Sequence, residues 1–391
     1  MDGLEEFHDP ERISQRLAFH RKAIAEEQDA RNICDAVFIG PSQWWGNALR
    51  GVEGSQTAGM VTILIQRAET ALTQSPPDAL ELSGLAVSVA AQLKPEDYPY
   101  DQVMKLRGQA LREQAYVLSY VGRLVEAARI ADLAGVMLGQ SVLPLIELAR
   151  LDLVRSNIAR NMGKYDQAVE YARAAGETYR DFGNRRSWLL AVDYEAAAYT
   201  SAQNYQAALE LWRSTEQYVE ILTAEHRAAR LHNIGLAASA LGDYEEATRT
   251  LAGAVQEFER LGLVVNRVKC RYSLGLAMHE AGRHSEAIGV LKQAQEELDA
   301  LGMETDAALA ALVRVEALFA AGRPDDVPAI CRMVIDRFKR AGNDSAAMTA
   351  LAFLRETVAT GHATAASVRQ VRDFIRDVTT TGRDSTKRLD Q

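Results

Sequence analysis

The chain has 391 residues, of which 48% are hydrophobic and 25% are charged, a composition typical of a folded protein. Its net charge of −9 offers no cationic field for DNA, RNA or an anionic membrane, so neither a nucleic acid nor a membrane is expected as its partner. Three cysteines far apart in sequence, an acidic start without a secretory signal and the lack of a long apolar run predict a cytoplasmic location.

Residues 1–54 form the first predicted segment, which is helical but does not follow the pattern of the rest. The stretch from Pro10 to about Phe38 reads as one or two helices. Gly40 and Pro41 end that stretch, and Ser42 is a candidate N-cap for the residues that follow.

Two interpretations of this segment stay open. The run I-G-P-S-Q-W before N-A-L-R-G resembles the recognition-helix region of helix-turn-helix domains of the XRE type, which implies DNA binding. Residues 1–51, however, hold nine acidic and six basic side chains, which is the wrong balance for a phosphate-binding surface. The alternative is a helical cap in which Trp44 and Trp45 close the first hydrophobic layer.

A first repeat is predicted from Ser55 to Leu93, with S-P-P-D-A-L-E-L-S-G-L-A-V-S-V-A-A-Q-L as its second helix. Ala79 and Ala86 in that helix stand at the spacing of small residues seen in the later repeats. The following K-P-E-D-Y-P-Y, residues 94–100, predicts an ordered loop.

Six further segments, about 40 residues apart, are similar to one another, and such a fixed period is typical of repeat proteins. They read V-G-R-L-V-E-A-A from Val121, M-G-K-Y-D-Q-A-V from Met162, A-Q-N-Y-Q-A-A-L from Ala202, L-G-D-Y-E-E-A-T from Leu241, A-G-R-H-S-E-A-I from Ala281 and A-G-R-P-D-D-V-P from Ala321. Each segment predicts the end of a first helix, a tight turn and the start of a second helix. A glycine in the left-handed conformation can close the first helix.

Small residues recur on both predicted helices of each repeat. Before the turn they are Ala115, Ser156, Ala196, Gly235 and Gly275, and after it Ala127, Ala168, Ala208, Ala247 and Ala287. Residues further along the second helix at spacings of four and three, such as Ala131 and Ala134, fall on the same helical face. Small side chains there let neighbouring helices approach closely.

The repeat N-I-G-x-A-x-x-x-L-G-D-Y-E-E-A-x-x-x-L-x-x-A from Asn233 resembles the tetratricopeptide repeat (TPR). The period here is about six residues longer than the usual 34, which is similar to bacterial regulators of the Rap and MalT type, kinesin light chains and LGN-like adaptors. The resemblance implies an all-α, right-handed solenoid of about seven helix-turn-helix repeats over residues 55–343, with helical caps. Pro324 and Pro328 depart from the pattern and predict a late start for the last second helix.

Beyond residue 343 we expect capping helices over 344–380, at about 344–360 and 364–380, and a frayed tail over 381–391.

The sequence contains no motif of a catalytic or cofactor site. A phosphate-binding G-x-x-x-x-G-K-[ST] loop, a dinucleotide-binding glycine motif and a G-x-S-x-G elbow are all missing. His279 and His284 are five residues apart and lie on either side of a predicted turn, which favours a structural role over a metal site. The prediction is a protein that is not an enzyme and has no cofactor and no metal.

In this architecture the first helices line the concave surface, so residues at fixed distances before the turn are candidates for a groove that binds a peptide or protein. Asparagine at such a place can pair with the backbone of a bound peptide whatever its sequence, and in the families that this chain resembles an asparagine in this region contacts peptide; Asn233 matches best. The candidate residues are Arg112, Tyr116, Asn157, Arg160, Asp193, His232, Asn233, Tyr272 and His279. Some of them could instead serve only helix packing.

The favoured function is a non-catalytic scaffold that grips a peptide or protein segment, as a regulator in a bacterial signalling or transcription circuit. A structural adaptor within a larger complex and a DNA-binding regulator with a TPR sensor are the alternatives. A homodimer formed through the N-terminal helices also stays open.

Overall fold

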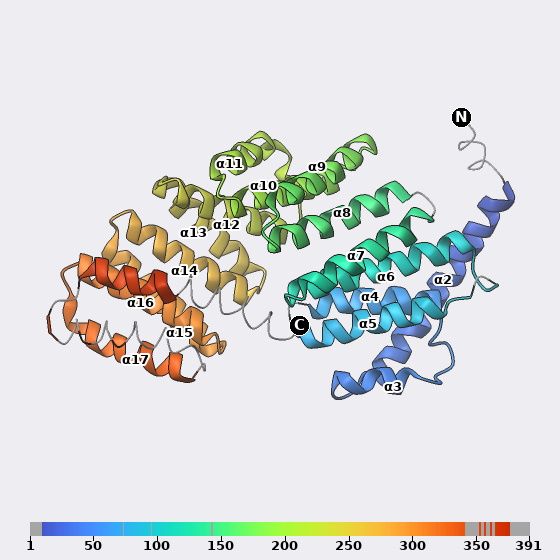
Figure 1. Ribbon diagram of the computed structural model, residues 1–391, viewed down its shortest axis with the longest axis horizontal. Helices are drawn as coiled ribbons and strands as arrows, with labels where there is room; N and C mark the ends of the chain where they lie inside the picture. Colours follow the sequence, from blue (N-terminus) through green and yellow to red (C-terminus); the bar gives the residue numbers. More distant parts are fainter. Residues whose placement is uncertain are drawn as a thin grey trace. The chain divides into compact units, whose positions relative to one another are not determined.

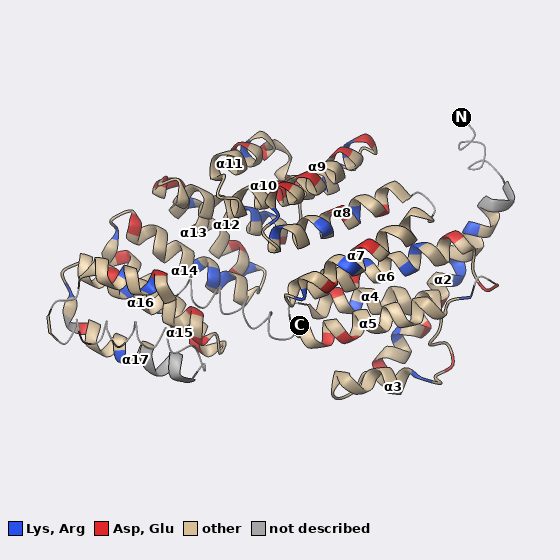
Figure 2. Ribbon diagram, viewed as in Figure 1, with Lys and Arg blue, Asp and Glu red and all other residues tan. Residues whose placement is uncertain are grey.

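The computed structural model describes residues 10–72, 74–94, 96–141, 144–340, 352, 356, 360–361 and 364–375 (Figure 1). These residues form α-helices joined by turns and short 3-10 helices, and none of them lies in a strand. The chain divides into two compact units, Met1–Asn204 and Tyr205–Gln391, called here the N-terminal unit and the C-terminal unit. Acidic and basic residues are both scattered over the helices of the two units (Figure 2).

Seven pairs of helices follow one another, each with a first helix, a tight turn and a second helix. Repeats 1 to 7 are α4 (Ala58–Ala71) with α5 (Pro76–Gln92), α6 (Tyr100–Tyr120) with α7 (Leu124–Gly139), α8 (Pro144–Asn161) with α9 (Tyr165–Asp181), α10 (Arg185–Ser201) with α11 (Tyr205–Ser214), α12 (Ala224–Ala240) with α13 (Tyr244–Arg260), α14 (Val264–Glu280) with α15 (His284–Ala300), and α16 (Glu304–Ala320) with α17 (Val327–Arg340). The predicted all-α solenoid of about seven repeats is confirmed.

The residue that closes each first helix from α6 onward has a positive φ, which the sequence predicted where that residue is glycine. Five of these residues are glycines, and the sixth is Gln203, with a φ of 61°. The glycines are Gly122, Gly163, Gly242, Gly282 and Gly322, with φ between 67° and 82°. A residue with a Cβ is strained in this conformation, whereas glycine is not.

Replacing Gln203 by glycine and replacing one of the turn glycines by glutamine should therefore change stability in opposite directions. We expect Gln203→Gly to raise the free energy of unfolding by up to about 1 kcal/mol, and Gly163→Gln to lower it by about 1 kcal/mol. No heavy atom lies near the position that a Cβ would take at Gly163, so backbone strain alone is tested there. Thermal unfolding followed by circular dichroism measures both, and shifts of the same sign would contradict this explanation.

Small residues make the close contacts between first and second helices. The predicted alanines at the turn-side positions, Ala115, Ala127, Ala168, Ala208 and Ala287 among them, are fully buried. A Cβ on Gly235 would lie 2.5 Å from Cγ of Leu251, and one on Gly275 would lie 2.6 Å from Cγ of Leu291. These distances leave no room for a larger side chain, so the repeating glycine and alanine positions have a steric cause.

The N-terminal segment begins with one long helix, α2 (Pro10–Val37), followed by the short elements η2 (Ser42–Trp44) and α3 (Trp45–Leu49). Ser42 was expected to cap a helix, but Pro41 is the N-cap residue and no side-chain cap bond forms. Trp45 stacks on Phe38 with ring centroids 4.9 Å apart and packs against the core, whereas Trp44 is 59% exposed. Of the two tryptophans, only Trp45 therefore closes the first layer.

The five-residue α3 occupies the stretch that resembles a recognition helix. A helix of about one turn is short for reading bases in a major groove. This segment therefore adds no support to the DNA-binding alternative.

Helix α2 packs directly on α4. Glu26 on α2 accepts hydrogen bonds from the backbone N of Gly59, at 3.2 Å, and from the hydroxyl of Tyr98, at 2.8 Å. The Tyr98 hydroxyl in turn accepts from the backbone N of Ala58, at 3.3 Å. The loop predicted at residues 94–100 is thus held to the N-terminus of α4 by a buried tyrosine.

Two repeats depart from the regular pattern. Helix α11 is short and ends at Ser214, so the buried Thr215 lies after its end and precedes the 3-10 helix η3 (Glu216–Ile221). In repeat 7 the 3-10 turn η4 (Pro324–Asp326) precedes α17, which begins at Val327. This is the late start that the two prolines predicted.

Beyond α17 the described residues include one helical stretch, 365–375. The helix expected at 344–360 lies outside the described residues except for Ala352 and Glu356, which are helical, and the tail at 381–391 lies outside them entirely. The boundaries at residues 54, 343 and 380 stay predictions. In the described part of the chain, no helix combines the length and the apolar character needed to cross a membrane.

Candidate ligand-binding face

The first helices of neighbouring repeats contact one another within each unit. In the N-terminal unit α4 contacts α6, α6 contacts α8 and α8 contacts α10, and in the C-terminal unit α12 contacts α14 and α14 contacts α16. The candidate residues lie on these helices, three to ten residues before the turn. We call their side chains the inner row: Arg112, Tyr116, Asn157, Arg160 and Asp193 in the N-terminal unit, and His232, Asn233, Tyr272 and His279 in the C-terminal unit.

A chain of hydrogen bonds connects α6 with α8 in the N-terminal unit. Asn157 donates its side-chain N–H to Oγ of Ser119 at 3.0 Å. Its amide oxygen accepts from the guanidinium of Arg160 at 2.8 Å. Both side chains are half-buried. One N–H of the Asn157 amide and most N–H groups of Arg160 remain for a ligand.

Arg160 lies among aromatic side chains rather than carboxylates. Burial lowers the pKa of Arg160, and the nearby phenols of Tyr194, Tyr116 and Tyr165 oppose that change. No carboxylate of the described residues pairs with Arg160. An arginine stays charged even so, and the inner row of this unit therefore carries a positive charge that the chain itself does not neutralise.

Arg112 differs from Arg160 because it has an ionic partner. Its guanidinium lies 2.8 Å from a carboxylate oxygen of the buried Glu147 on α8. Asp193, on α10, is half-buried and also has an interaction partner within the chain. Of the predicted residues in the N-terminal unit, Asn157 and Arg160 are brought together most directly.

The predicted residues of the C-terminal unit mostly face neighbouring helices. The ring of His232 meets Phe258 edge-on with centroids 6.4 Å apart, and burial lowers the pKa of His232 to about 4. Tyr272 packs against two hydrophobic clusters. Asn233 is half-buried and forms no hydrogen bond with the described residues, which leaves its amide for a ligand.

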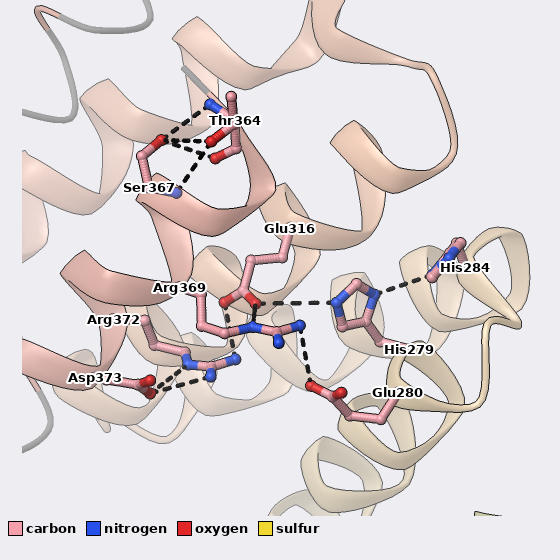
Figure 3. Close-up of polar contacts among 9 residues, drawn as sticks. All are labelled: His279, Glu280, His284, Glu316, Thr364, Ser367, Arg369, Arg372 and Asp373. Carbon is pink, nitrogen blue, oxygen red and sulfur yellow. Dashed lines mark hydrogen bonds and ion pairs between the residues drawn. The ribbon is translucent and has the colours of Figure 1, made fainter. Parts of the chain in front are cut away.

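His279 is buried, with 4% of its surface exposed, so it does not present its ring to a partner. Its Nδ1 lies 3.1 Å from Nδ1 of His284 across the turn, and its Nε2 lies 3.9 Å from Glu316 (Figure 3). Burial lowers the pKa of His279 to about 4, so the ring is neutral near pH 7. Among the residues that the structure describes, no group of three or more His, Cys, Asp or Glu side chains could hold a metal ion.

Sequence reasoning missed Glu316, which stands six residues before the turn, the place that Tyr116 and Asn157 hold in their repeats. It is fully buried and meets two arginines from residues 364–375. The available signal was a single carboxylate in the otherwise apolar stretch V-E-A-L-F of α16. A buried charge in such a run needs partners from elsewhere in the chain.

A scan against protein-family models found no match, and a search of curated proteins found none either. Solved structures with a similar fold were found. One is a signal-transduction ATPase of the STAND class with a tetratricopeptide repeat sensor from Pyrococcus horikoshii, with a TM-score of 0.64 at 10% identity over 94% of this chain. This chain covers 54% of that longer one.

Two further structures are matched over nearly their whole length. A Rap protein complexed with competence and sporulation factor has a TM-score of 0.57 at 13% identity, and the match covers 92% of this chain and 99% of that one. The apo form of the quorum sensor NprR from B. thuringiensis has a TM-score of 0.53 at 12% identity, with 86% and 99% covered. At these identities the likeness concerns the fold, which is that of TPR-containing proteins.

Proposed function

We propose that this chain, which has a TPR-type solenoid fold, is a non-catalytic binding protein that holds a peptide or protein segment on the inner row and acts as a regulator in bacterial signalling. The Rap protein is seen in complex with competence and sporulation factor, and NprR is a quorum sensor. Both support a role in signal recognition for a chain of the same fold.

The observation that carries the proposal is the pairing of Asn157 with Arg160. A guanidinium without a carboxylate partner, next to tyrosine rings, suits an anionic group such as an aspartate, a glutamate or a C-terminal carboxylate. The adjacent amide of Asn157 can pair with a peptide backbone. The ligand proposed for the N-terminal unit is therefore a peptide segment with at least one carboxylate.

Affinity capture from the native cell with quantitative mass spectrometry tests this proposal. We expect Asn157→Ala with Arg160→Ala to reduce the captured partner at least tenfold, because a charge-assisted hydrogen bond contributes about 1.5–3 kcal/mol. Asn233→Ala with Tyr272→Ala is the corresponding pair in the C-terminal unit. Circular dichroism confirms that each variant is folded.

Arg180→Ala is the matched control, because Arg180 is an exposed arginine on the second helix α9. Its capture should equal that of the unchanged chain. If neither inner-row pair reduces capture, the inner row does not bind the partner.

A structural adaptor is the second candidate, and it has its own supporting observation. Val125, Leu133 and Val136 on α7 are 65%, 47% and 56% exposed. Their spacing of eight and three residues places them on one face of the helix. A partner held there would be lost on substitution of these three residues by serine and retained in the Asn157 and Arg160 variant.

A further inference from the structure

The helical stretch at residues 365–375 lies against α16 and reaches the end of α14 in the C-terminal unit (Figure 3). Thr364 and Ser367 mark its start. The backbone N of Ser367 donates to Oγ1 of Thr364 at 3.2 Å, and Oγ of Ser367 accepts from the backbone N of Thr364 at 2.9 Å. This reciprocal pair resembles a capping box, so the helix has its own start signal.

One face of this helix is apolar. Val368, Val371 and Ile375, at spacings of three and four residues, are buried in the hydrophobic cluster of repeat 7. The helical residues of that cluster are Ala308, Ala311, Leu312, Val315 and Leu318 on α16 and Val327, Ile330, Cys331 and Val334 on α17. Phe374 on the same helix is 47% exposed, so the stretch is amphipathic.

Two arginines three residues apart bind the carboxylate of Glu316. Nη1 of Arg372 lies 2.8 Å from one oxygen of Glu316, and Nε of Arg369 lies 3.1 Å from the other. Nη2 of Arg369 also lies 3.3 Å from Glu280 on α14. Arg372 further pairs with its neighbour Asp373 at 3.0 Å. The helix thus places two guanidinium groups on an acidic site of α14 and α16.

The arginines are the charges that balance Glu316. Its side chain is fully buried, and burial raises the pKa of Glu316 against the opposing effect of Arg372 and Arg369. The third neighbour, His279, is neutral near pH 7 and supplies no charge. A buried carboxylate without a cation is costly. If this carboxylate is to stay ionised, the segment that covers it has to bring positive charge, as residues 364–375 do.

A helix of this length is marginal in water on its own and owes its order to docking. The helix docks on Glu316, which stands six residues before the turn of its repeat. Tyr116 and Asn157 of the inner row hold the same position in their repeats. The contact consists of three apolar anchors and the two arginines, and Arg369 remains 47% exposed. A segment of the same chemistry could compete for this place.

We infer that residues 364–375 are an internal ligand of the C-terminal unit, and that the external partner of this face is an amphipathic helix with two basic residues three apart. This inference rests on the proposed binding function and names the partner class for one of the two units. The external helix replaces the internal one. Its basic residues form the ion pairs with Glu280 and Glu316, and its apolar residues pack against the hydrophobic cluster of repeat 7. The internal copy acts as a competitor with an effective concentration of about 1 mM.

A fluorescent synthetic peptide of residues 361–378 is the probe, and the full-length chain is the receptor. We expect the peptide to bind the full-length variant Arg369→Glu with Arg372→Glu at least thirtyfold more tightly than it binds the unchanged chain, measured by fluorescence anisotropy. The two glutamates repel Glu316 and release the internal helix. A peptide with the same two substitutions should bind neither protein.

Arg249→Glu with Arg323→Glu is the matched control, because it changes the charge of the C-terminal unit equally at two exposed arginines that do not pair with Glu316. It should bind the peptide as weakly as the unchanged chain does. Glu316→Gln is the second variant, and it should speed hydrogen exchange in residues 364–375 while α16 stays protected.

Equal peptide binding to the Arg369 and Arg372 variant and to the unchanged chain would overturn the inference. Loss of hydrogen-exchange protection throughout α16 and α17 in that variant would overturn it too, because the helix would then be a fixed part of the fold. Either result leaves the capture experiment at Asn157 and Arg160 unaffected, so the two proposals can fail separately.

Discussion

Gly59→Ala is expected to separate α2 from α4 and to lower the free energy of unfolding of the N-terminal unit by about 3 kcal/mol. Gly59 is near the start of α4, where α2 crosses it. A Cβ at this position would lie 2.4 Å from the backbone carbon of Glu26 and 2.4 Å from the backbone N of Glu27. Backbone atoms cannot rotate out of the way as the end of a flexible side chain can, so α2 has to move as a whole.

The displacement removes more than van der Waals contact. Glu26 would lose the hydrogen bond from the backbone N of Gly59 and its place opposite the hydroxyl of Tyr98. The buried contact between Sγ of Cys34 and Sδ of Met60, at 3.7 Å, lies on the same interface. All of these groups would be exposed or left without a partner, which adds to the cost of the steric clash.

Hydrogen exchange measured by mass spectrometry over residues 10–37, together with thermal unfolding, tests the effect of Gly59→Ala. Gly84→Ala is the control, because Gly84 lies inside α5 and its Cβ would approach no atom more closely than Nε2 of Gln114, at 3.9 Å. That change should stabilise the chain by about 0.5–1 kcal/mol, since alanine favours helix over glycine. Equal protection of α2 in both variants would show that the close approach at Gly59 does not hold the two helices together.

The repeats could be predicted from sequence because each of their features has a local cause. A glycine at the turn has to adopt a positive φ, and a small residue has to stand where two helices approach closely. Gly235 and Gly275 are examples of such small residues. A Cβ on either glycine would lie within 3 Å of a leucine side chain of the following helix, which is why no larger residue fits there. These signals recur about every 40 residues, so a repeat whose own signals are weak can still be recognised from the others.

The contact between α2 and α4 has no such signal. Glu26, Gly59 and Tyr98 meet only once in the chain and come from three separate segments. A single glycine before an apolar run does not reveal which backbone passes over it. For the same reason Ser42 was assigned as an N-cap from its residue type, although Pro41 holds that position.

The sequence predicted which positions of the first helices the candidate residues occupy, but not which way their side chains point. The candidate residues do lie before the turn on the first helices, yet His232 turns to Phe258 and His279 is enclosed by the following helices. Sequence spacing fixes the position on a helix, whereas the neighbouring side chains decide whether a group packs or stays accessible. Glu316 shows the reverse case, because its partners lie more than 50 residues away in sequence.

Glu147→Ala should lower the free energy of unfolding of the N-terminal unit by about 3–5 kcal/mol, which is typical of removing one partner from a buried ion pair. The side chain of Glu147 is 5% exposed and connects α8 with α6. Its oxygens lie 2.8 Å from Nη1 of Arg112, 3.0 Å from Nε2 of Gln109 and 3.1 Å from Nη1 of Arg150.

The cost arises mainly at Arg112. Only 13% of its side chain is exposed, so without Glu147 its guanidinium would be a buried charge without its partner. The nearest remaining acid on the same helix is Glu113, but burial raises the pKa of Glu113 to about 8 and keeps it largely protonated near neutral pH. Glu113 therefore cannot replace the lost charge at pH 7.

Urea unfolding of the full chain at pH 7 measures the effect, with Glu126→Ala as the control. Glu126 on α7 forms an ion pair with Arg123, the residue before that helix, and the two side chains are 36% and 52% exposed. A surface pair contributes about 0–1 kcal/mol, so this control should change stability by no more than that. Similar losses for the two variants would mean that water already screens Glu147, and the link between α6 and α8 would then depend on apolar packing alone.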